Sequence, residues 1–310
     1  MPRPFRLVVN PSAGAGRARR RLQHVEAVFR SRGASFETHL TKGPRDATRI
    51  VREALRAQAP GIAVMGGDGT LHEAVNGFFD LDGEPIQTSA WLAPLPCGTG
   101  GDFRRTVGLG TDPVAAASQM LSREPASVDV GWISFVDHGG ADRSVAFLNI
   151  ASFGLGGLVD DLVNQSPKWL GGRASFFLGT LRGLARYRKP RVEWSVDDGE
   201  PIVDQILNVA VANGQFFGGG MKVAPQAKID DGLLDVVSIG DLNVVEQARF
   251  TPHLYRGTHL GRAKVGHRTG VTVRARSLDG EPVLIDVDGE ALGRLPATFW
   301  VRPDALRLRA

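Results

Sequence analysis

The chain has 310 residues, of which 42% are hydrophobic and 23% charged, a composition typical of a soluble globular protein with two domains. The formal net charge of +4 is mildly basic and suits an anionic small molecule or an acidic membrane surface; we expect no nucleic-acid partner. Cys97 is the single cysteine, which excludes an intramolecular disulfide and favours a reducing compartment. Without a signal-peptide pattern or a run of about 18 apolar residues, a cytoplasmic protein is expected.

The first 130 residues alternate between buried-strand and amphipathic-helix patterns. Strands are expected at 5–9, 35–41, 61–65 and 90–95, and helices at 17–33, 45–58, 70–79, 102–107 and 112–122. Repeated strand–helix units predict an α/β domain with a mainly parallel sheet covered on both faces. Such sheets bind ligands at the carboxyl ends of their strands.

After residue 130 the pattern of predicted secondary structure changes. Short β-branched segments separated by Gly, Pro or Asp turns predict an antiparallel β-sandwich-like domain. Helical patterns interrupt it at 173–188 and 243–260. We therefore expect an α/β domain at 1–130 and a β-rich domain at 131–299, with a last strand near 300–310 returning to the first domain.

Three strands of the first half run into glycine-rich loops, N-P-S-A-G-A-G at 10–16, G-G-D-G-T at 66–70 and P-C-G-T-G-G-D-F at 96–103. A glycine loop lets backbone N–H groups approach an anion, and the following helix adds its positive end. Because all three loops fall at one edge of the predicted sheet, they predict a phosphate-binding site. The Walker loop and the dinucleotide fingerprint are both absent.

Part of the central loop has a plain structural interpretation. Thr70 and Glu73 form the T-x-x-E pattern of a capping box, which starts a helix. A capping box does not explain Asp68, a carboxylate held between glycines. Such a group suits the ordering of a metal-bound water or a basic side chain beside a polyphosphate. Asp102 repeats this arrangement in the third loop.

Six segments in this order resemble the diacylglycerol kinase catalytic family, which includes bacterial lipid kinases and sphingosine and ceramide kinases. They are V-N-P-S-A-G-A-G-R-A, T-H-L-T-K-G-P-R-D-A, G-G-D-G-T-L-H-E-A-V-N-G, L-P-C-G-T-G-G-D-F-R-R, V-A-P-Q-A-K-I-D-D-G-L-L-D-V-V and V-D-G-E. Each motif alone is modestly specific, whereas all six in family order are highly specific. The resemblance covers nearly the whole chain.

The resemblance implies transfer of the γ-phosphoryl group of ATP to a lipid hydroxyl, with Mg²⁺ as the metal. By motif, Glu290 corresponds to the catalytic base, while Asp68 and Asp102 correspond to carboxylates of a water–Mg²⁺ network. The implied structural Mg²⁺ site comprises Lys228, Asp231 and Leu233. The implied nucleotide contacts are Asn10, Pro11, Ser12, Ala13, Gly14, Thr41, Gly66, Gly67, Asp68, Gly69, Thr70, Leu71, His72, Glu73 and Thr99.

Some of these positions have simpler interpretations, and two depart from the family. Asp230 and Asp231 also fit an ordinary D-G turn, and Glu290 also fits a solvated hairpin. His72 stands where the family usually has Asn, and we expect it in the first turn of the helix as a tolerated polar residue. Gly101 replaces an Asn that could hydrogen-bond the nucleotide.

Two rival functions remain open at this stage. NAD kinases also carry a G-G-D-G-T loop, so a soluble-metabolite kinase is one alternative. A nucleotide- or lipid-binding regulator without turnover is the other. The segment 167–191 combines apolar and basic residues, which suits peripheral membrane contact as well as helix packing on the β domain. The acceptor lipid is not indicated, and a homodimer is a candidate assembly.

Overall fold

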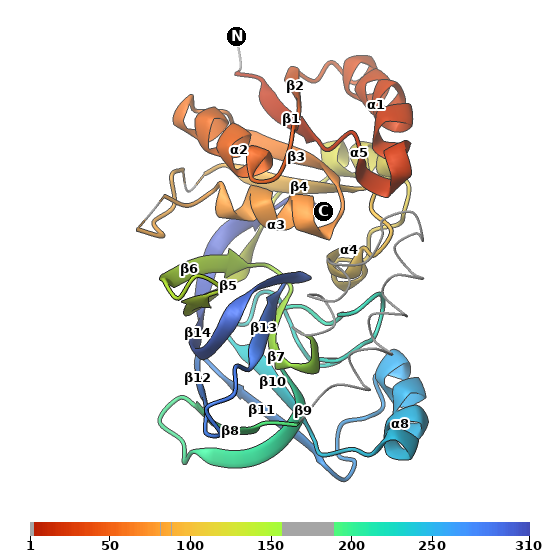
Figure 1. Ribbon diagram of the computed structural model, residues 1–310. Helices are drawn as coiled ribbons and strands as arrows, with labels where there is room; N and C mark the ends of the chain where they lie inside the picture. Colours follow the sequence, from red (N-terminus) through yellow and green to blue (C-terminus); the bar gives the residue numbers. More distant parts are fainter. Residues whose placement is uncertain (1–2, 81, 88, 157–188) are drawn as a thin grey trace. The chain divides into compact units, whose positions relative to one another are not determined.

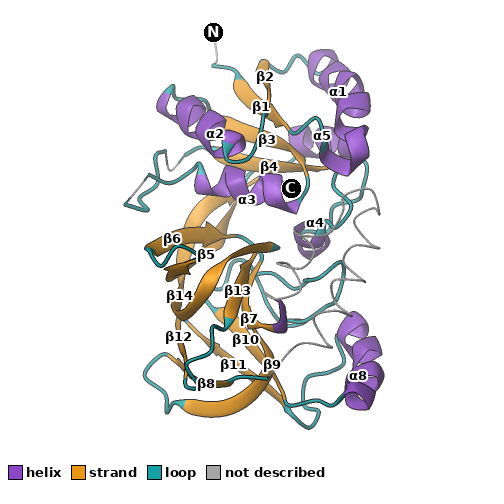
Figure 2. Cartoon of the chain, viewed as in Figure 1, coloured by secondary structure: helices purple, strands orange, loops and turns teal. Residues whose placement is uncertain are grey.

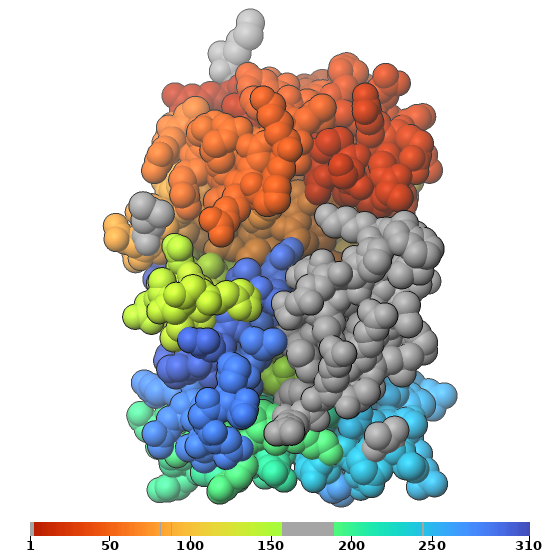
Figure 3. Space-filling model, in the orientation of Figure 1, coloured from red at the N-terminus to blue at the C-terminus, as the bar shows by residue number. Residues whose placement is uncertain are grey.

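The computed structural model describes residues 3–80, 82–87, 89–156 and 189–310; the others are grey in Figure 3. The chain divides into two compact units, one of Met1–Asp129 with Asp304–Ala310 and the other of Val130–Pro303. The sequence predicts 1–130, 131–299 and a returning last strand. The segment 167–191 and the helix expected at 173–188 lie outside the described residues, apart from residues 189–191.

The first unit is built on a parallel sheet. Its strands are β1 (Phe5–Val9), β2 (Phe36–Leu40), β3 (Gly61–Gly66) and β4 (Trp91–Pro96). They pair in the order β2-β1-β3-β4, and the end of β14 (Glu290–Leu308) joins β4 in parallel through Arg307 opposite Trp91. All six residues of β3 are buried, as expected for a strand covered on both faces.

Helices cover both faces of this sheet (Figure 1). Phe5, Leu7 and Val9 of β1 pack in one apolar cluster with residues of α1 (Ala13–Ser31) and α5 (Pro113–Ser122). The other face carries α2 (Asp46–Arg56) and α3 (Asp68–Asn76), which contact each other and strands β1 and β3. The short helix α4 (Asp102–Thr106) follows β4. This three-layer arrangement brings the ends of β1, β3 and β4 to one edge.

The second unit is mainly strand (Figure 2). Its strands are β5 (Ala126–Asp137), β6 (Asp142–Phe147), β7 (Ile150–Gly154), β8 (Arg191–Val196), β9 (Ile202–Ala212), β10 (Leu234–Gly240), β11 (Val265–Gly270), β12 (Thr272–Ser277) and β13 (Leu284–Val287), with part of β14. Its helix α8 (Val244–Arg256) has a capping box made by Asn243 and Glu246 and ends at Gly257, a left-handed residue. The sequence predicts a helix at 243–260, and the observed helix ends earlier because Gly257 adopts the left-handed conformation that terminates it.

Six antiparallel strands of this unit close on themselves. The ring runs β9-β7-β13-β14-β12-β8 and returns to β9. The two layers of the predicted sandwich are thus joined into a barrel-like sheet, with β10 and β11 extending from β9, and β5 and β6 from β14. Its interior is apolar and includes Phe153, Trp194 and Phe299. The long strand β14 makes the closure possible because successive parts of it pair with different strands.

The barrel wall formed by β7, β9 and β10 also has a covered outer face. Ile150, Ala210 and Val237 point there and pack against Val223 and Ala224 of the loop before β10. Helix α8 adds Phe250, which packs with Leu207 and Ile239. In the part of the chain described, no helix has the length and apolar character that crossing a bilayer needs.

Candidate functional site

The loop after β1 is tied to the start of α3 by Asn10. The side-chain amide of Asn10 donates to Thr70 Oγ1 at 3.0 Å, and its Oδ1 accepts from the Ser12 backbone N–H at 3.1 Å. The Asn10 backbone N–H donates to the carbonyl of Met65 in β3. Asn10, one of the nucleotide contacts implied by the family resemblance, therefore holds two of the three glycine-rich loops in a fixed relation.

Glycines bring the loop backbones into contact. A Cβ on Gly98 would lie 2.6 Å from the Cα of Gly67, closer than real Cβ atoms approach. Gly14 is left-handed, with φ of +59°, and a Cβ there would lie 2.1 Å from the carbonyl oxygen of Cys97. Only glycine fits both requirements at position 14. The backbones of the three loops therefore lie against one another in the first unit.

Asp68 and Asp102 belong to one hydrogen-bond network in this unit. Asp68 Oδ2 accepts from the backbone N–H of Gly101 at 2.6 Å and of Asp102 at 3.4 Å. The guanidinium of Arg105 donates to the carbonyls of Gly100 and Gly101 and pairs with Asp102 at 3.0 Å. The structure therefore brings the two carboxylates together, and both shape the third loop.

Glu73 does not make the predicted capping box. Helix α3 begins at Asp68 with Gly67 as its N-cap, so Thr70 lies inside the helix and accepts from Asn10. The Glu73 carboxylate instead accepts from the backbone N–H groups of Arg45 and Ala47, at 2.8 and 3.2 Å. These N–H groups at the start of α2 have no acceptor within the helix, and a carboxylate stabilises them. Glu73 thus joins α3 to α2.

The other predicted contact positions differ in accessibility. Leu71 and His72 are buried in α3, and His72 lies beyond the first turn that the sequence suggests. Thr41 follows β2 and is half-buried, whereas Thr99 is exposed in the third loop. Gly101 has a φ of +66°, and a Cβ there would lie 2.5 Å from Arg104 Nε. Its backbone and the space occupied by Arg104 therefore favour glycine at this departure from the family pattern.

Two ionisable groups beside the loops have shifted pKa values. Burial raises the pKa of the Cys97 thiol to about 11, which keeps the thiol protonated at neutral pH. Burial also lowers the pKa of the Arg104 guanidinium, and the neighbouring Arg105 charge acts in the same direction. Arg104 remains a cation at neutral pH since guanidinium groups titrate far above it.

In the second unit, the D-G-E motif forms a tight hairpin. Asp288 and Gly289 have φ of +52° and +89°, as in a two-residue type I′ turn, and Val287 pairs with Glu290 across it. The Asp288 carboxylate accepts three backbone N–H bonds at 3.0 to 3.1 Å, from Leu148, Asn149 and Ile150. The half-buried Glu290 is thus displayed by a turn that is anchored to the start of β7.

A chain of hydrogen bonds leads from this anchored loop to the A-P-Q-A segment. The Asn149 carbonyl accepts from the Asn213 backbone N–H at 2.9 Å. Two residues further on, the carbonyl of Gln215 accepts from Ala224, and the Gln215 side chain donates to the carbonyl of Ala227 at 3.0 Å. Hydrogen bonds therefore connect two family motifs of the second half within this unit.

The residues of the implied structural Mg²⁺ site lie just after that segment. Lys228 and Asp231 are exposed, and Asp231 Oδ1 accepts from the Leu233 backbone N–H at 3.1 Å. Gly232 between them is left-handed. One carboxylate and backbone carbonyls are oxygen donors of the kind Mg²⁺ prefers, so the donor chemistry fits. Within the described ranges, no group of three or more His, Cys, Asp or Glu side chains forms a metal cluster.

Three polar residues near the hairpin were not among the site residues predicted from the sequence. Asp286 of β13 lies opposite Ser152 of β7, and both are fully buried, while Asn208 of β9 accepts from the Gly156 N–H. All three alternate with core residues along their strands and so face away from the barrel interior. The available signal was an acidic residue within the apolar run V-L-I-D-V.

Comparison with known proteins gives matches over both halves of the chain. Residues 4–133 match the diacylglycerol kinase catalytic domain, and residues 149–310 match the YegS C-terminal NAD kinase beta sandwich-like domain. A diacylglycerol kinase of Bacillus subtilis (strain 168) is 28% identical, over 95% of this chain and 92% of the relative. A probable lipid kinase YegS-like protein of Pseudomonas aeruginosa (strain UCBPP-PA14) is 34% identical, over 91% and 87%.

Solved structures share the fold. A diacylglycerol kinase structure from Bacillus anthracis str. Sterne has a TM-score of 0.69 and 22% identity, covering 99% of this chain and 96% of that one. Yeast NADH kinase complexed with NADH has a TM-score of 0.50 and 10% identity, covering 99% and 83%. These structural likenesses concern the fold, and the sequence matches identify the family. The chain belongs to the family that combines a diacylglycerol kinase catalytic domain with a YegS-type C-terminal domain.

Proposed function

We propose that this protein is an ATP-dependent lipid kinase, acting in the cytoplasm and peripherally at a membrane surface. The observation that carries the proposal is the packing of the three glycine loops against one another, where Gly67 and Gly98 are in backbone contact and Asp68 holds the third loop. Backbone N–H groups and helix N-termini bind phosphates. The relatives named as diacylglycerol and lipid kinases support the reaction type.

In this proposal the first unit binds ATP. The loop of Asn10, the start of α3 and the loop around Thr99 contact the phosphates. Mg²⁺ would be held near them by Asp68 and Asp102, with a second ion at Lys228, Asp231 and Leu233. When bound, Mg²⁺ neutralises charge that develops on the phosphate oxygens. Hydrogen bonds of Arg105 and Asp68 hold the third loop in its observed conformation.

Glu290 of the second unit takes the proton of the lipid hydroxyl. The acceptor oxygen forms a bond to the γ-phosphorus as the bond from that phosphorus to the β,γ-bridging oxygen breaks, and ADP leaves. The proton goes to the Glu290 carboxylate. Such general-base assistance contributes about 10²- to 10⁴-fold to the rate. Asp288 acts on this step indirectly because its hydrogen bonds fix the turn that presents Glu290.

A kinetic comparison of variants tests these roles on a verified lipid substrate. Glu290→Gln should lower kcat about 10²- to 10⁴-fold while the KM for ATP changes little. Glu281→Gln, at an exposed position in the same unit, serves as the matched control and should behave as wild type. Asp68→Asn should weaken nucleotide binding by loosening the third loop. Full activity in both Glu290→Gln and Asp68→Asn would contradict the proposal.

Two other outcomes distinguish the rival functions. Formation of NADP from NAD, without lipid phosphorylation, would assign the chain to soluble-metabolite kinases. Nucleotide binding without turnover across a broad lipid panel would indicate a regulator. Either result contradicts the proposed reaction while leaving the fold and the loop geometry intact.

A further inference from the structure

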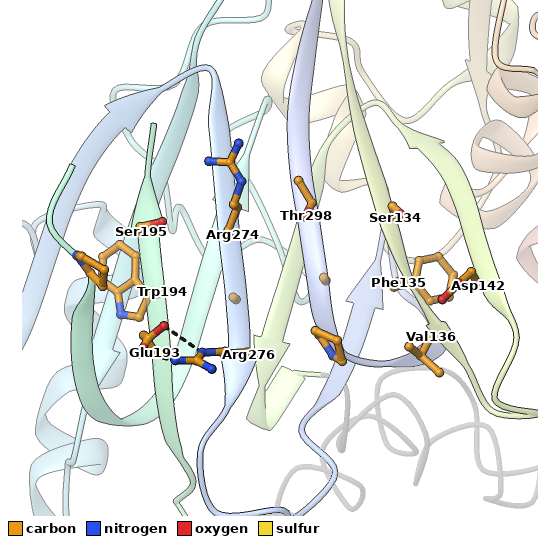
Figure 4. Close-up of a pocket in the computed structure, with 14 residues that line it drawn as sticks. Ser134, Phe135, Val136, Asp142, Glu193, Trp194, Ser195, Arg274, Arg276 and Thr298 are labelled. Carbon is orange, nitrogen blue, oxygen red and sulfur yellow. Dashed lines mark hydrogen bonds and ion pairs between the residues drawn. The ribbon is translucent and has the colours of Figure 1, made fainter. Parts of the chain in front are cut away.

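A groove of about 510 Å³ lies on the outer face of the barrel in the second unit, and none of the residues that line it is a predicted site residue (Figure 4). Strands β8, β12, β14 and β5 supply its floor. Val273 and Ala275 of β12 point into the barrel core, so Arg274 and Arg276 must point outward. The volume falls within the range of small-molecule sites.

One row of polar side chains crosses the groove from strand to strand. Arg274 pairs with Ser195 of β8 on one side and with Thr298 of β14 on the other. Ser134 of β5 continues the row in Figure 4. Side chains at paired positions lie about 5 Å apart on one face. The base of the Arg274 side chain is therefore flanked by two residues whose hydroxyl groups can both donate and accept hydrogen bonds.

The two arginines of the groove differ in whether another side chain of the protein binds them. Arg276 is held by Glu193 through two hydrogen bonds, of 2.8 and 2.9 Å. Arg274 is exposed, and among the residues that the structure describes no hydrogen bond or ion pair engages its side chain. The Glu193–Arg276 pair is satisfied within the protein, so Arg274 is the cation that remains to bind a ligand here.

The rest of the groove restricts the kind of ligand. Pro296 and Val136 line it beside the polar row and offer an apolar wall to an organic group. Asp142 also lines it and is exposed. A flat anionic membrane would bring many negative charges toward this carboxylate, whereas a small ligand can turn its single anionic group to Arg274. Arginine binds phosphate with a planar, two-pronged geometry.

We propose that this groove binds a soluble phosphate monoester with a small apolar body, by contact of the phosphate with Arg274 and the hydroxyls of Ser195 and Thr298. The site is separate from the proposed ATP site and does not depend on kinase activity. The apolar part of the ligand packs on Pro296 and Val136.

The test measures binding of radiolabelled phenyl phosphate and inorganic phosphate by equilibrium dialysis. Wild type is compared with Arg274→Gln and with Arg268→Gln, an exposed arginine on β11 outside the groove. Phosphate bound at the glycine loops is common to all three proteins and cancels in the comparison. Urea unfolding midpoints confirm that the variants are folded. Sedimentation with phosphatidylglycerol vesicles forms the second arm.

Arg274→Gln should weaken phenyl phosphate binding by at least about 10-fold, as expected for loss of a charged hydrogen-bond donor, and Arg268→Gln should leave it unchanged. Phenyl phosphate should bind more tightly than inorganic phosphate because of the apolar wall. Equal binding by wild type and Arg274→Gln, or equal losses in both variants, would overturn the site. Vesicle binding that requires Arg274, without soluble binding, would overturn the choice of a soluble ligand.

Discussion

Replacement of Asp288 by Asn tests the anchored hairpin most sharply. The substitution keeps the size of the side chain, and Asn tolerates the left-handed backbone found at this position. It removes one acceptor oxygen and the negative charge. The side-chain NH₂ then meets one of the three backbone N–H donors, of Leu148, Asn149 and Ile150, which the carboxylate satisfies in the wild-type protein.

The expected cost follows from these three hydrogen bonds. Leu148 is buried, so leaving its N–H without an acceptor costs about 1–3 kcal/mol. The other two bonds change from charged to neutral acceptors, which roughly halves their strength and costs about 0.5–1 kcal/mol each. The free energy of unfolding of the second unit should fall by about 2–5 kcal/mol.

Native-state hydrogen exchange measures this loss of stability at individual backbone amides. The amides of residues 148–150 should exchange at least about 30-fold faster in Asp288→Asn, since 1.4 kcal/mol corresponds to a factor of ten. Asp304→Asn is the matched control, because Asp304 has the same left-handed φ of 52° but is exposed. It should change stability by less than about 0.5 kcal/mol. Wild-type exchange rates in Asp288→Asn would refute the anchoring role.

Three further predictions concern the first unit. Gly98→Ala should weaken binding of a fluorescent ATP analogue, because its Cβ would lie 2.6 Å from Gly67 Cα; unchanged binding would show that the loop contact is dispensable. Glu73→Ala should lower the urea unfolding free energy by about 1–2 kcal/mol through loss of the cap on α2, and an unchanged midpoint would contradict that cap. Iodoacetamide should alkylate Cys97 at pH 8 at least about 100-fold more slowly in the folded than in the urea-unfolded chain, because burial raises the thiol pKa to about 11. As pH rises from about 9 through 11, the rate should increase and the native state lose stability, since the unfolded thiol ionises first. Comparable rates in both states at pH 8, measured by mass spectrometry, would contradict the burial.

Local patterns predicted the first unit well for a physical reason. Parallel strands covered on both faces are continuous apolar runs, so β1, β3 and β4 are visible in the sequence, and the glycine loops follow them directly. The partner of Glu73 was not predictable in the same way. Its spacing to Thr70 fits a capping box, but its real partners, Arg45 and Ala47, are 28 and 26 residues away.

The second unit depends more on long-range pairing. Short β-branched segments indicate strands, but they do not show that β14, of 19 residues, pairs successively with β13, β12 and β4. The barrel closure follows from that pairing. The D-G pair predicts the hairpin, whereas the three amides that Asp288 binds come from residues about 140 positions earlier. Arg274 belongs to no motif, and only strand register places it between hydroxyls.

The most direct test of the proposed function is transfer of radiolabel from γ-labelled ATP to a total lipid extract, followed by chromatography. A lipid kinase should give a labelled lipid in the organic phase that depends on the protein and on Mg²⁺, and this label should be lost in Glu290→Gln. Label that appears only in NADP after addition of NAD, or no labelled lipid from any extract with a protein that binds ATP, would contradict the proposed function.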